Sequence, residues 1–212
     1  MEFSSLKYFI TKLEKIDLPG DSFHHQLAPL FRQKELETLS EQRKNTNYAG
    51  VVSLLYPKNG EIHMAFILRK TYKGVHSNQI GFPGGRYEEV DLNLERTALR
   101  ETEEEIGVEA NKIKLIKPLT QLYIPPSNFL VYPFLCYVDF EPSFVLQESE
   151  VENMIEIPLS ICLDKNNLNT EIIQASYAKN VEVPAFNFNG NVVWGATAMI
   201  LSEIRELFSR IA

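Results

Sequence analysis

The chain has 212 residues, of which 44% are apolar and 23% charged, with 13 Phe and 9 Tyr available for a core. This composition is typical of a globular protein, and the length fits one large domain or one domain with an added segment. The formal net charge of −7 argues against duplex nucleic acid as a partner, because phosphate binding normally needs a basic surface.

Two further absences in the sequence guide its interpretation. No apolar run approaches the roughly 20 residues of a membrane-spanning helix, so no membrane association is expected. Residues 1–16 mix charged and apolar side chains and lack the unbroken apolar centre of a signal peptide.

The two cysteines, Cys136 and Cys162, lie in apolar surroundings without metal-type spacing, which favours buried free thiols in a reducing, cytoplasmic compartment.

The first 45 or so residues are predicted to form a helical extension. Leu6, Phe9, Ile10 and Leu13 recur at helical spacing, and a second apolar pattern follows Pro19-Gly20. The polar stretch 40–47 is typical of a linker. We therefore expect an N-terminal extension over 1–45 and a main domain over 46–212.

The main domain begins with strands. Residues 49–56 and 62–68 flank Pro57-Lys58-Asn59-Gly60, which is a good hairpin turn. A long loop over 70–79 leads to a helix with Asp91 as its expected N-cap and Gly107 as its C-terminal stop. Further elements expected in chain order are strands over 113–123 and 129–140, a strand or short helix over 154–159, a hairpin of 183–188 with 192–194, and a helix over 197–211. This order predicts an α+β fold with hairpins rather than strict βαβ alternation.

The predicted helix before Gly107 carries four glutamates within five positions: Glu101, Glu103, Glu104 and Glu105. Such a cluster is often a solvated helix face. At about 100° per residue, however, Glu101 and Glu105 fall within about 20° of the apolar Leu94. Carboxylates at the margin of a buried face repel each other unless a cation intervenes. The pattern therefore favours a Mg²⁺-type site, whereas Glu103 is expected on the solvated surface of the helix, outside that site.

A double glycine, Gly84-Gly85, stands one loop ahead of this helix. It is consistent with a simple tight turn. It is also consistent with a close approach of the backbone to a phosphate or a metal, because glycine has no side chain in the way. Its position before the acidic helix favours the second interpretation.

The segment from Gly85 to Val108 resembles the Nudix box, usually written Gly-x5-Glu-x7-Arg-Glu-U-x-Glu-Glu-x-Gly-U, where U is apolar. Arg100, Glu101, Glu104, Glu105 and Gly107 match its second half, with Thr102 in an apolar position. In the first half the acidic residue is Asp91, and eight residues rather than seven separate it from Arg100. The resemblance implies an α/β/α sandwich with a mixed β-sheet.

The shifted spacing is similar to the branch of Nudix hydrolases that cleaves coenzyme A. The segment His76 to Gly85 resembles that branch's His-x-Gly-Gln-x-x-Phe-Pro-Gly-Gly, and further segments up to about residue 205 follow in the branch's order. Arg69 matches an Arg of the coenzyme-A-associated signature. Gly74 and Asn78 occupy the positions of its second Arg and its Gly, which leaves the substrate open; Lys70 and Lys73 are the nearby cations.

The resemblance implies water attack on a diphosphate bond with the help of Mg²⁺ or Mn²⁺. If the family's roles are transferred to the positions that match its motif, Glu101 and Glu105 are the principal metal ligands. Glu104 is then a further ligand or a base, and Arg100 orients a neighbouring carboxylate. Glu150 is a candidate for another ligand or the general base. Arg69, His76, Gly84 and Gly85 are candidates for substrate binding. Each has a plain structural alternative: an ion-paired surface residue for the charged side chains, a loop histidine for His76, and a turn for the glycines.

Three functions follow as hypotheses. The leading one is a coenzyme A diphosphatase that gives 3′,5′-ADP and 4′-phosphopantetheine. The second keeps the chemistry but takes another nucleoside diphosphate derivative, such as NADH or ADP-ribose. For any of these substrates Tyr123, Phe129 and Trp194 are candidates for stacking on adenine, although aromatic residues in such strands more often belong to the core. The third is a nucleotide sensor without activity, which the intact set of glutamates disfavours. The sequence leaves the oligomeric state open, a homodimer included.

Overall fold

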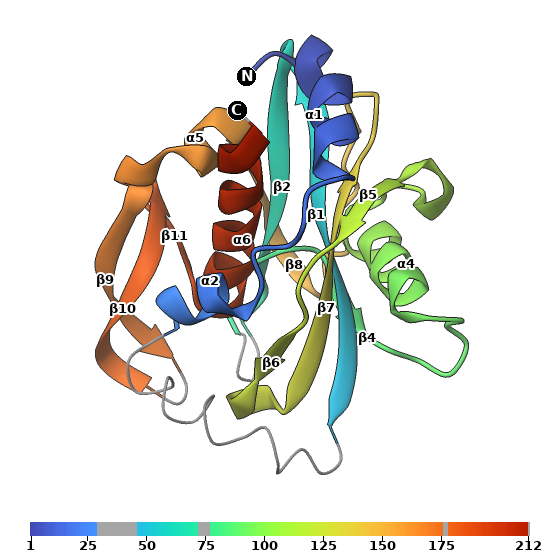
Figure 1. Cartoon of the computed structure of the whole chain (residues 1–212). Coiled ribbons are helices and arrows are strands. Elements are labelled where there is room, and N and C mark those ends of the chain that lie inside the picture. The colour runs from blue at the N-terminus through green and yellow to red at the C-terminus, as the bar shows by residue number, and fades with distance from the viewer. Residues whose placement is uncertain (29–45, 72–76, 176–177, 212) are drawn as a thin grey trace.

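The computed structural model describes residues 1–28, 46–71, 77–175 and 178–211. Within these ranges the chain forms a mixed sheet, a smaller antiparallel sheet, and helices on both faces of the larger one (Figure 1). The helices are α1 (Leu6–Leu13), α2 (Asp21–Gln26), α4 (Leu94–Ile106), α5 (Leu159–Leu163) and α6 (Gly195–Ile211), and short 3-10 turns span Phe3–Ser5, Ala110–Lys112, Pro125–Ser127 and Lys165–Asn167.

The larger sheet is built around a central strand, β1 (Asn47–Lys58). It pairs antiparallel with β2 (Glu61–Arg69) and parallel with β7 (Phe129–Tyr137), which makes the sheet mixed. The remaining strands of this sheet are β3 (Ile80–Gly81), β4 (Gly84–Arg86), β5 (Lys114–Pro118), β6 (Leu122–Ile124) and β8 (Val151–Pro158). The smaller sheet has the order β11 (Asn191–Trp194), β10 (Ala178–Phe188), β9 (Leu168–Ala175).

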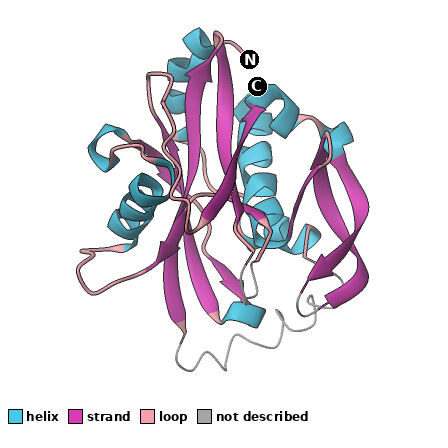
Figure 2. Ribbon diagram, turned by 180° about the vertical axis from the view of Figure 1, so that it is seen from behind, coloured by secondary structure: helices cyan, strands magenta, loops and turns pink. Residues whose placement is uncertain are grey.

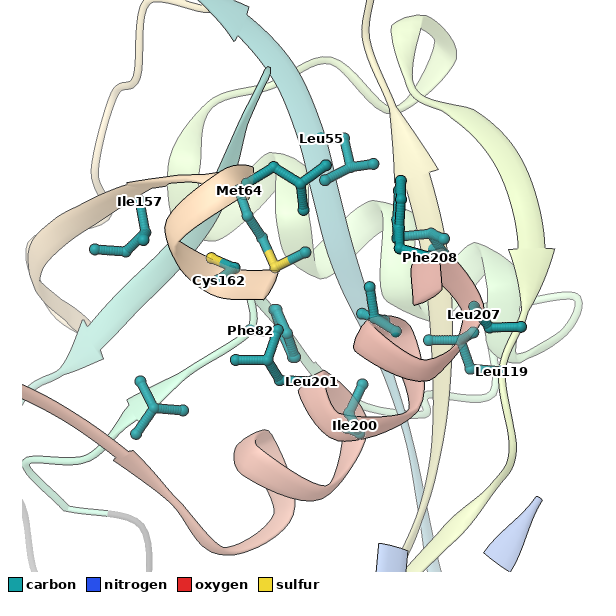
Figure 3. Packing of buried hydrophobic residues seen from close by; sticks show 14 of the residues in the cluster. Leu55, Met64, Phe82, Leu119, Ile157, Cys162, Ile200, Leu201, Leu207 and Phe208 are labelled. Atoms are coloured by element: carbon teal, nitrogen blue, oxygen red, sulfur yellow. The ribbon is translucent and has the colours of Figure 1, made fainter. Parts of the chain in front are cut away.

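Alternate side chains of β1 and β2 enter two different cores, as the period of two in a strand requires. Val52 and Leu54 face α4, where Ala98 and Ile106 complete one cluster. Leu55 of β1 and Met64 of β2 face the opposite side, where α5 and α6 pack against them (Figure 3) and α1 contributes to the same cluster. Figure 2 shows the sheet between these two helical layers, with the smaller sheet flanking α6. The fold is the predicted α+β sandwich.

The predicted hairpins are confirmed. Asn59 and Gly60 both have positive φ, 51° and 80°, as a tight turn between antiparallel strands requires, and Asn189-Gly190 repeats the arrangement between β10 and β11. The strand or helix expected over 154–159 is both: β8 ends at Pro158 and α5 begins at Leu159.

The structure differs from the expected order of strands at two places. The single strand expected over 113–123 is divided into β5 and β6, and β9 was not predicted at all. The division occurs because Thr120 leaves the strand ladder and donates from its N–H and its hydroxyl to the buried carboxylate of Glu203 on α6.

The N-terminal segment contributes to the main core wherever it is described. Leu6 and Leu13 of α1 are 1% and 0% exposed and belong to the same cluster as α6. Both cysteines are buried and free, as expected. In the described part of the chain, no helix combines the length and the apolar character that crossing a bilayer demands.

Candidate active site

Helix α4 carries the acidic cluster and has clear ends. Its N-cap is Asn93, whose side chain accepts a hydrogen bond from the N–H of Arg96 at 2.9 Å. The expectation that Asp91 caps the helix is wrong. Gly107 ends the helix in the left-handed conformation, with φ at 73°, as the sequence predicted.

Asp91 instead binds Arg100. Its two oxygens accept from Nε and Nη2 of the guanidinium at 2.9 and 3.0 Å, in the bidentate geometry that suits this pair. The hydroxyl of Thr97 and the N–H of Glu88 also donate to Asp91. The hydrogen bonds from Arg100 are the main cause that lowers the pKa of Asp91 to about 2. Asp91 is therefore a fixed anion that holds Arg100 in place.

Arg100 in turn holds two glutamates of the acidic cluster. Its Nη1 lies 3.1 Å from Oε1 of Glu101 and 3.2 Å from Oε2 of Glu104. These contacts are the ones that the expected role of Arg100, to orient neighbouring carboxylates, would need; the role itself stays a prediction. The Glu101 side chain is mostly buried and the Glu104 side chain is half exposed, at 14% and 49%.

Glu105 is the most enclosed residue of the cluster, with 1% of its side chain exposed. One oxygen accepts from Arg69 at 3.1 Å and the other from the N–H of Gly84 at 2.7 Å. Burial outweighs these two donors and raises the pKa of Glu105 to about 7, with a smaller contribution from the charges of Glu101 and Glu150. Burial likewise raises the pKa of Glu101.

The double glycine forms the short strand β4, which pairs antiparallel with β1. A Cβ on Gly85 would lie 2.4 Å from the carboxylate of Glu101, so only glycine lets this carboxylate reach the strand. Gly84 has φ at 138°, and a Cβ there would lie 2.3 Å from the carbonyl oxygen of Gly50. Both positions need glycine because of a close approach, and Gly84 needs it for its backbone conformation as well.

Gly84 and Gly85 line a cavity of about 440 Å³ together with Glu101 and Glu104 of the acidic cluster, whereas Glu105 is not part of its lining. Its polar side presents Arg69, Arg86, Arg100 and the carboxylates of Glu88, Glu101, Glu104 and Glu150. Its lining also includes a set of apolar residues, which we call the apolar wall, and Gly84 and Gly85 complete it; the apolar residues are Ala49, Val51, Phe82, Ile124, Phe129, Val131, Ala196 and Ile200.

The cavity gathers most of the predicted site residues. Of the three aromatic candidates for stacking on a base, only Phe129 lines it within the described part of the chain. His76 and Gly74 lie outside the described residues. Arg69, expected to bind substrate, is engaged by Glu105 and by the carbonyl oxygen of Gly84 at 2.8 Å. Arg86, to which the sequence assigned no role, also lines the cavity.

The donor set suits a hard divalent cation, because it consists of carboxylate oxygens. In the described ranges, no three Asp, Glu, His or Cys side chains already converge as a metal shell. Instead Arg100 and Arg69 bind the carboxylates of the cluster. These two arginines pair with four carboxylates, Asp91, Glu101, Glu104 and Glu105, so they supply fewer positive charges than the ionised cluster would carry. The residues therefore fit a cation that supplies the remaining positive charge.

Comparison with known proteins agrees with this site. A model of the NUDIX domain matches residues 46–170. The peroxisomal coenzyme A diphosphatase ndx-8 of Caenorhabditis elegans is 29% identical over 174 residues, which cover 81% of this chain and 73% of that protein. The uncharacterized Nudix hydrolase NudL of Yersinia pestis is 30% identical over 134 residues, or 63% of this chain and 66% of that protein.

A solved structure supports the fold alone. The Nudix hydrolase RenU of M. smegmatis superposes with a TM-score of 0.53 at 12% identity, over 77% of this chain and 86% of that one. The domain match covers more than half of the chain, and its residues include the acidic helix, the double glycine and Glu150. The chain therefore belongs to the Nudix hydrolase family.

Proposed function

We propose that the protein hydrolyses the diphosphate bond of coenzyme A or its derivatives, with Mg²⁺ or Mn²⁺, to give 3′,5′-ADP and 4′-phosphopantetheine. The observation that carries the proposal is the cavity that Glu101, Glu104 and Glu150 line together with the double glycine and a set of apolar side chains. Similarity to a relative named as a coenzyme A diphosphatase supports this choice of substrate.

The cation would be held by Glu101 and Glu105, with Glu104 or Glu150 as further ligands. When bound, such an ion neutralises phosphate oxygens and lowers the pKa of a coordinated water. Arg100 holds the carboxylates of Glu101 and Glu104 in position on α4 and is itself fixed by Asp91. Arg69 plays the same role for Glu105.

A general base must accept a proton from the attacking water, and two glutamates are placed for this. Glu104 is half exposed at the cavity. Glu150 precedes β8, and its carbonyl oxygen accepts from the N–H of Lys70 at 2.8 Å, which fixes its backbone beside β2. We assign the proton transfer to Glu104 and keep Glu150 as the alternative.

The apolar wall favours a substrate whose diphosphate carries an apolar or aromatic group on at least one side. The adenine of coenzyme A meets this requirement, and so do NADH and ADP-ribose. The second candidate function is therefore hydrolysis of NADH or ADP-ribose. It stays a candidate because Gly74 stands where the coenzyme-A-associated signature has its second Arg.

The deciding experiment is incubation of the purified protein with Mg²⁺ or Mn²⁺ and each of coenzyme A, NADH and ADP-ribose, followed by mass-spectrometric identification of the products. The highest kcat/KM is expected for coenzyme A. Faster cleavage of NADH or ADP-ribose would select the second function. Tight binding of all three without turnover would identify a sensor instead.

The two buried free thiols are consistent with a reducing compartment, and we place the reaction in the cytoplasm. Because one relative is named as peroxisomal, cell fractionation with compartment markers is the appropriate check. A homodimer is also part of this proposal, and analytical ultracentrifugation would show whether it forms.

A further inference from the structure

Arg86 ends β4 and lies on the cavity side of the sheet. It is paired with Ala49 across the antiparallel β1–β4 ladder, so the two side chains share one face. Ala49 and its neighbour at i+2, Val51, belong to the apolar wall of the cavity. Gly85 faces the other way, toward Glu101 on α4. Arg86 therefore lines the cavity from the same strand face as Ala49, next to a glycine that faces the acidic helix.

Among the residues that the structure describes, three arginines line the cavity, and they differ in their partners. Arg100 binds three carboxylates, and Arg69 binds the carboxylate of Glu105. Arg86 forms no ion pair with any residue in the described ranges, and its side chain donates only to the neutral amide oxygen of Asn47, at 3.1 Å. Of these three charges, that of Arg86 is the one left available for an anionic ligand.

The position of Arg86 is fixed at two points. Its carbonyl oxygen accepts from Nη2 of Arg100 at 3.2 Å, which ties its backbone to the acidic cluster. Its side chain is tied to Asn47, whose own N–H donates to the carbonyl oxygen of Asn128. A guanidinium held in this way has lost part of its conformational freedom before a ligand arrives, which favours binding.

We propose that Arg86 binds a phosphate oxygen of the substrate, that Asn47 positions its side chain, and that Arg69 acts on Glu105 rather than on substrate. This inference rests on the proposed function and names the phosphate-binding group of the same site. A guanidinium presents a rigid fork of donors that matches phosphate geometry. Arg86 would thereby supply, from β4, the positively charged side chain that the coenzyme-A-associated signature has as its second Arg and that Gly74 lacks.

The test compares four variants in two assays. Arg86→Ala, Arg86→Lys and Asn47→Asp are measured beside Arg96→Ala, which removes one exposed positive charge from α4 outside the cavity. One assay gives kcat and KM with the best substrate, and the other gives the affinity for ADP by calorimetry with Mg²⁺. Circular dichroism and thermal unfolding establish that each variant is folded.

For Arg86→Ala we expect KM to rise and ADP affinity to fall by roughly tenfold, with kcat changed by less than about threefold. Arg86→Lys should recover part of the loss, because it keeps the charge but not the fork. Asn47→Asp is nearly isosteric and gives Arg86 a carboxylate partner, so it should weaken ADP binding while leaving the guanidinium in place. Arg96→Ala should match the wild type in both assays.

Equal KM and equal ADP affinity in Arg86→Ala and Arg96→Ala would overturn the inference. So would a loss confined to kcat, because that would show that Arg86 acts on the chemical step or on the structure of the site. If the wild type cleaved none of the three substrates, the proposed function would fail, while the ADP affinities would still decide whether Arg86 binds phosphate. Failure of the wild type to bind ADP would count against both.

Discussion

At the scale of single residues, the burial of Glu105 makes the stability of the protein depend on pH. Its pKa is raised from 4.5 to about 7, so between these values the folded state holds a proton that the unfolded state has released. The free energy of unfolding contributed by this group is therefore present in full at low pH and is lost as the pH rises toward 7.

The variant Glu105→Gln lacks this titration. In EDTA, the wild type should lose stability relative to Glu105→Gln between pH 4.5 and 7, by on the order of 3 kcal/mol. Urea denaturation at pH 5 and pH 8 measures the difference, with the exposed Glu103→Gln as control. Mg²⁺ should restore part of the loss in the wild type alone, since it favours the ionised carboxylate. Parallel pH profiles for wild type and Glu105→Gln would contradict this account.

Glu103 and Glu104 are adjacent in sequence and offer a matched pair for activity. Glu104 lines the cavity, whereas Glu103 lies on another side of α4, where its carboxylate accepts from the N–H of Ala110 at 2.9 Å. We expect Glu104→Gln to lower kcat by about 100-fold or more, as loss of a base or a metal ligand does, and Glu103→Gln to stay near the wild type. Full activity in Glu104→Gln would remove that residue from the site and transfer the role of base to Glu150.

The sequence predicts where the glutamates lie on α4, but it says less about how their side chains are held. The helical period correctly placed Glu101 and Glu105 at the margin of the buried face, because the position on a helix depends on local spacing alone. The pairing of Glu105 with Arg69, 36 positions away, depends on how β2 packs beside α4, and no local pattern encodes it. For the same reason the local pattern around Asp91 predicts a helix cap, although its partner in the structure is Arg100.

At the scale of elements, the contact between β1 and α4 requires a glycine in the strand. A Cβ on Gly50 would lie 2.3 Å from the carbonyl oxygen of Leu94 and 2.9 Å from the Cβ of Ala98. The helix carrying the acidic cluster thus packs directly on the strand backbone, which fixes the distance between Glu101 and β4.

Gly50→Ala should push α4 away from the sheet. We expect a loss of about 1–3 kcal/mol in the free energy of unfolding, as for other overpacked sites, together with a fall in activity at a temperature where the variant is folded. Gly81→Ala is the stability control, because a Cβ there would have no neighbour nearer than 3.8 Å. Chemical denaturation compares the two, and equal stability would show that α4 can move without cost.

Some elements could be predicted because their signals are local. The Asn-Gly turns identified both hairpins, since residues that tolerate positive φ are needed there. By contrast, the break between β5 and β6 depends on Glu203, which lies 83 positions beyond Thr120. β9 has no clear alternation of polar and apolar residues, with Ile172 67% exposed beside the buried Ile173, and it is defined by its pairing with β10.

At the scale of the whole molecule, the sequence predicted the fold class because the order of strands and helices excludes a purely parallel sheet. It did not predict how the N-terminal segment packs, since an amphipathic pattern shows which face is apolar but not what covers it. In the structure α1 lies beside α6, and Lys12 donates from Nζ to the carbonyl oxygen of Ile211 at 3.0 Å. Lys117 of β5 likewise donates to the carbonyl oxygen of Ile16.

We infer that the described N-terminal residues fold and unfold together with the Nudix domain. Leu13 is fully buried in the cluster that contains α6, so Leu13→Ala should lower the free energy of unfolding by roughly 2–5 kcal/mol. Lys7→Ala, on the exposed side of the same helix, is the matched control and should have little effect. Because Leu13 is distant from the cavity residues in the sequence and absent from the cavity lining, KM should stay unchanged at low temperature. A single denaturation transition, shifted as a whole in Leu13→Ala, is the expected result, whereas a separate early transition for the N-terminal helix would show that it folds as an independent extension.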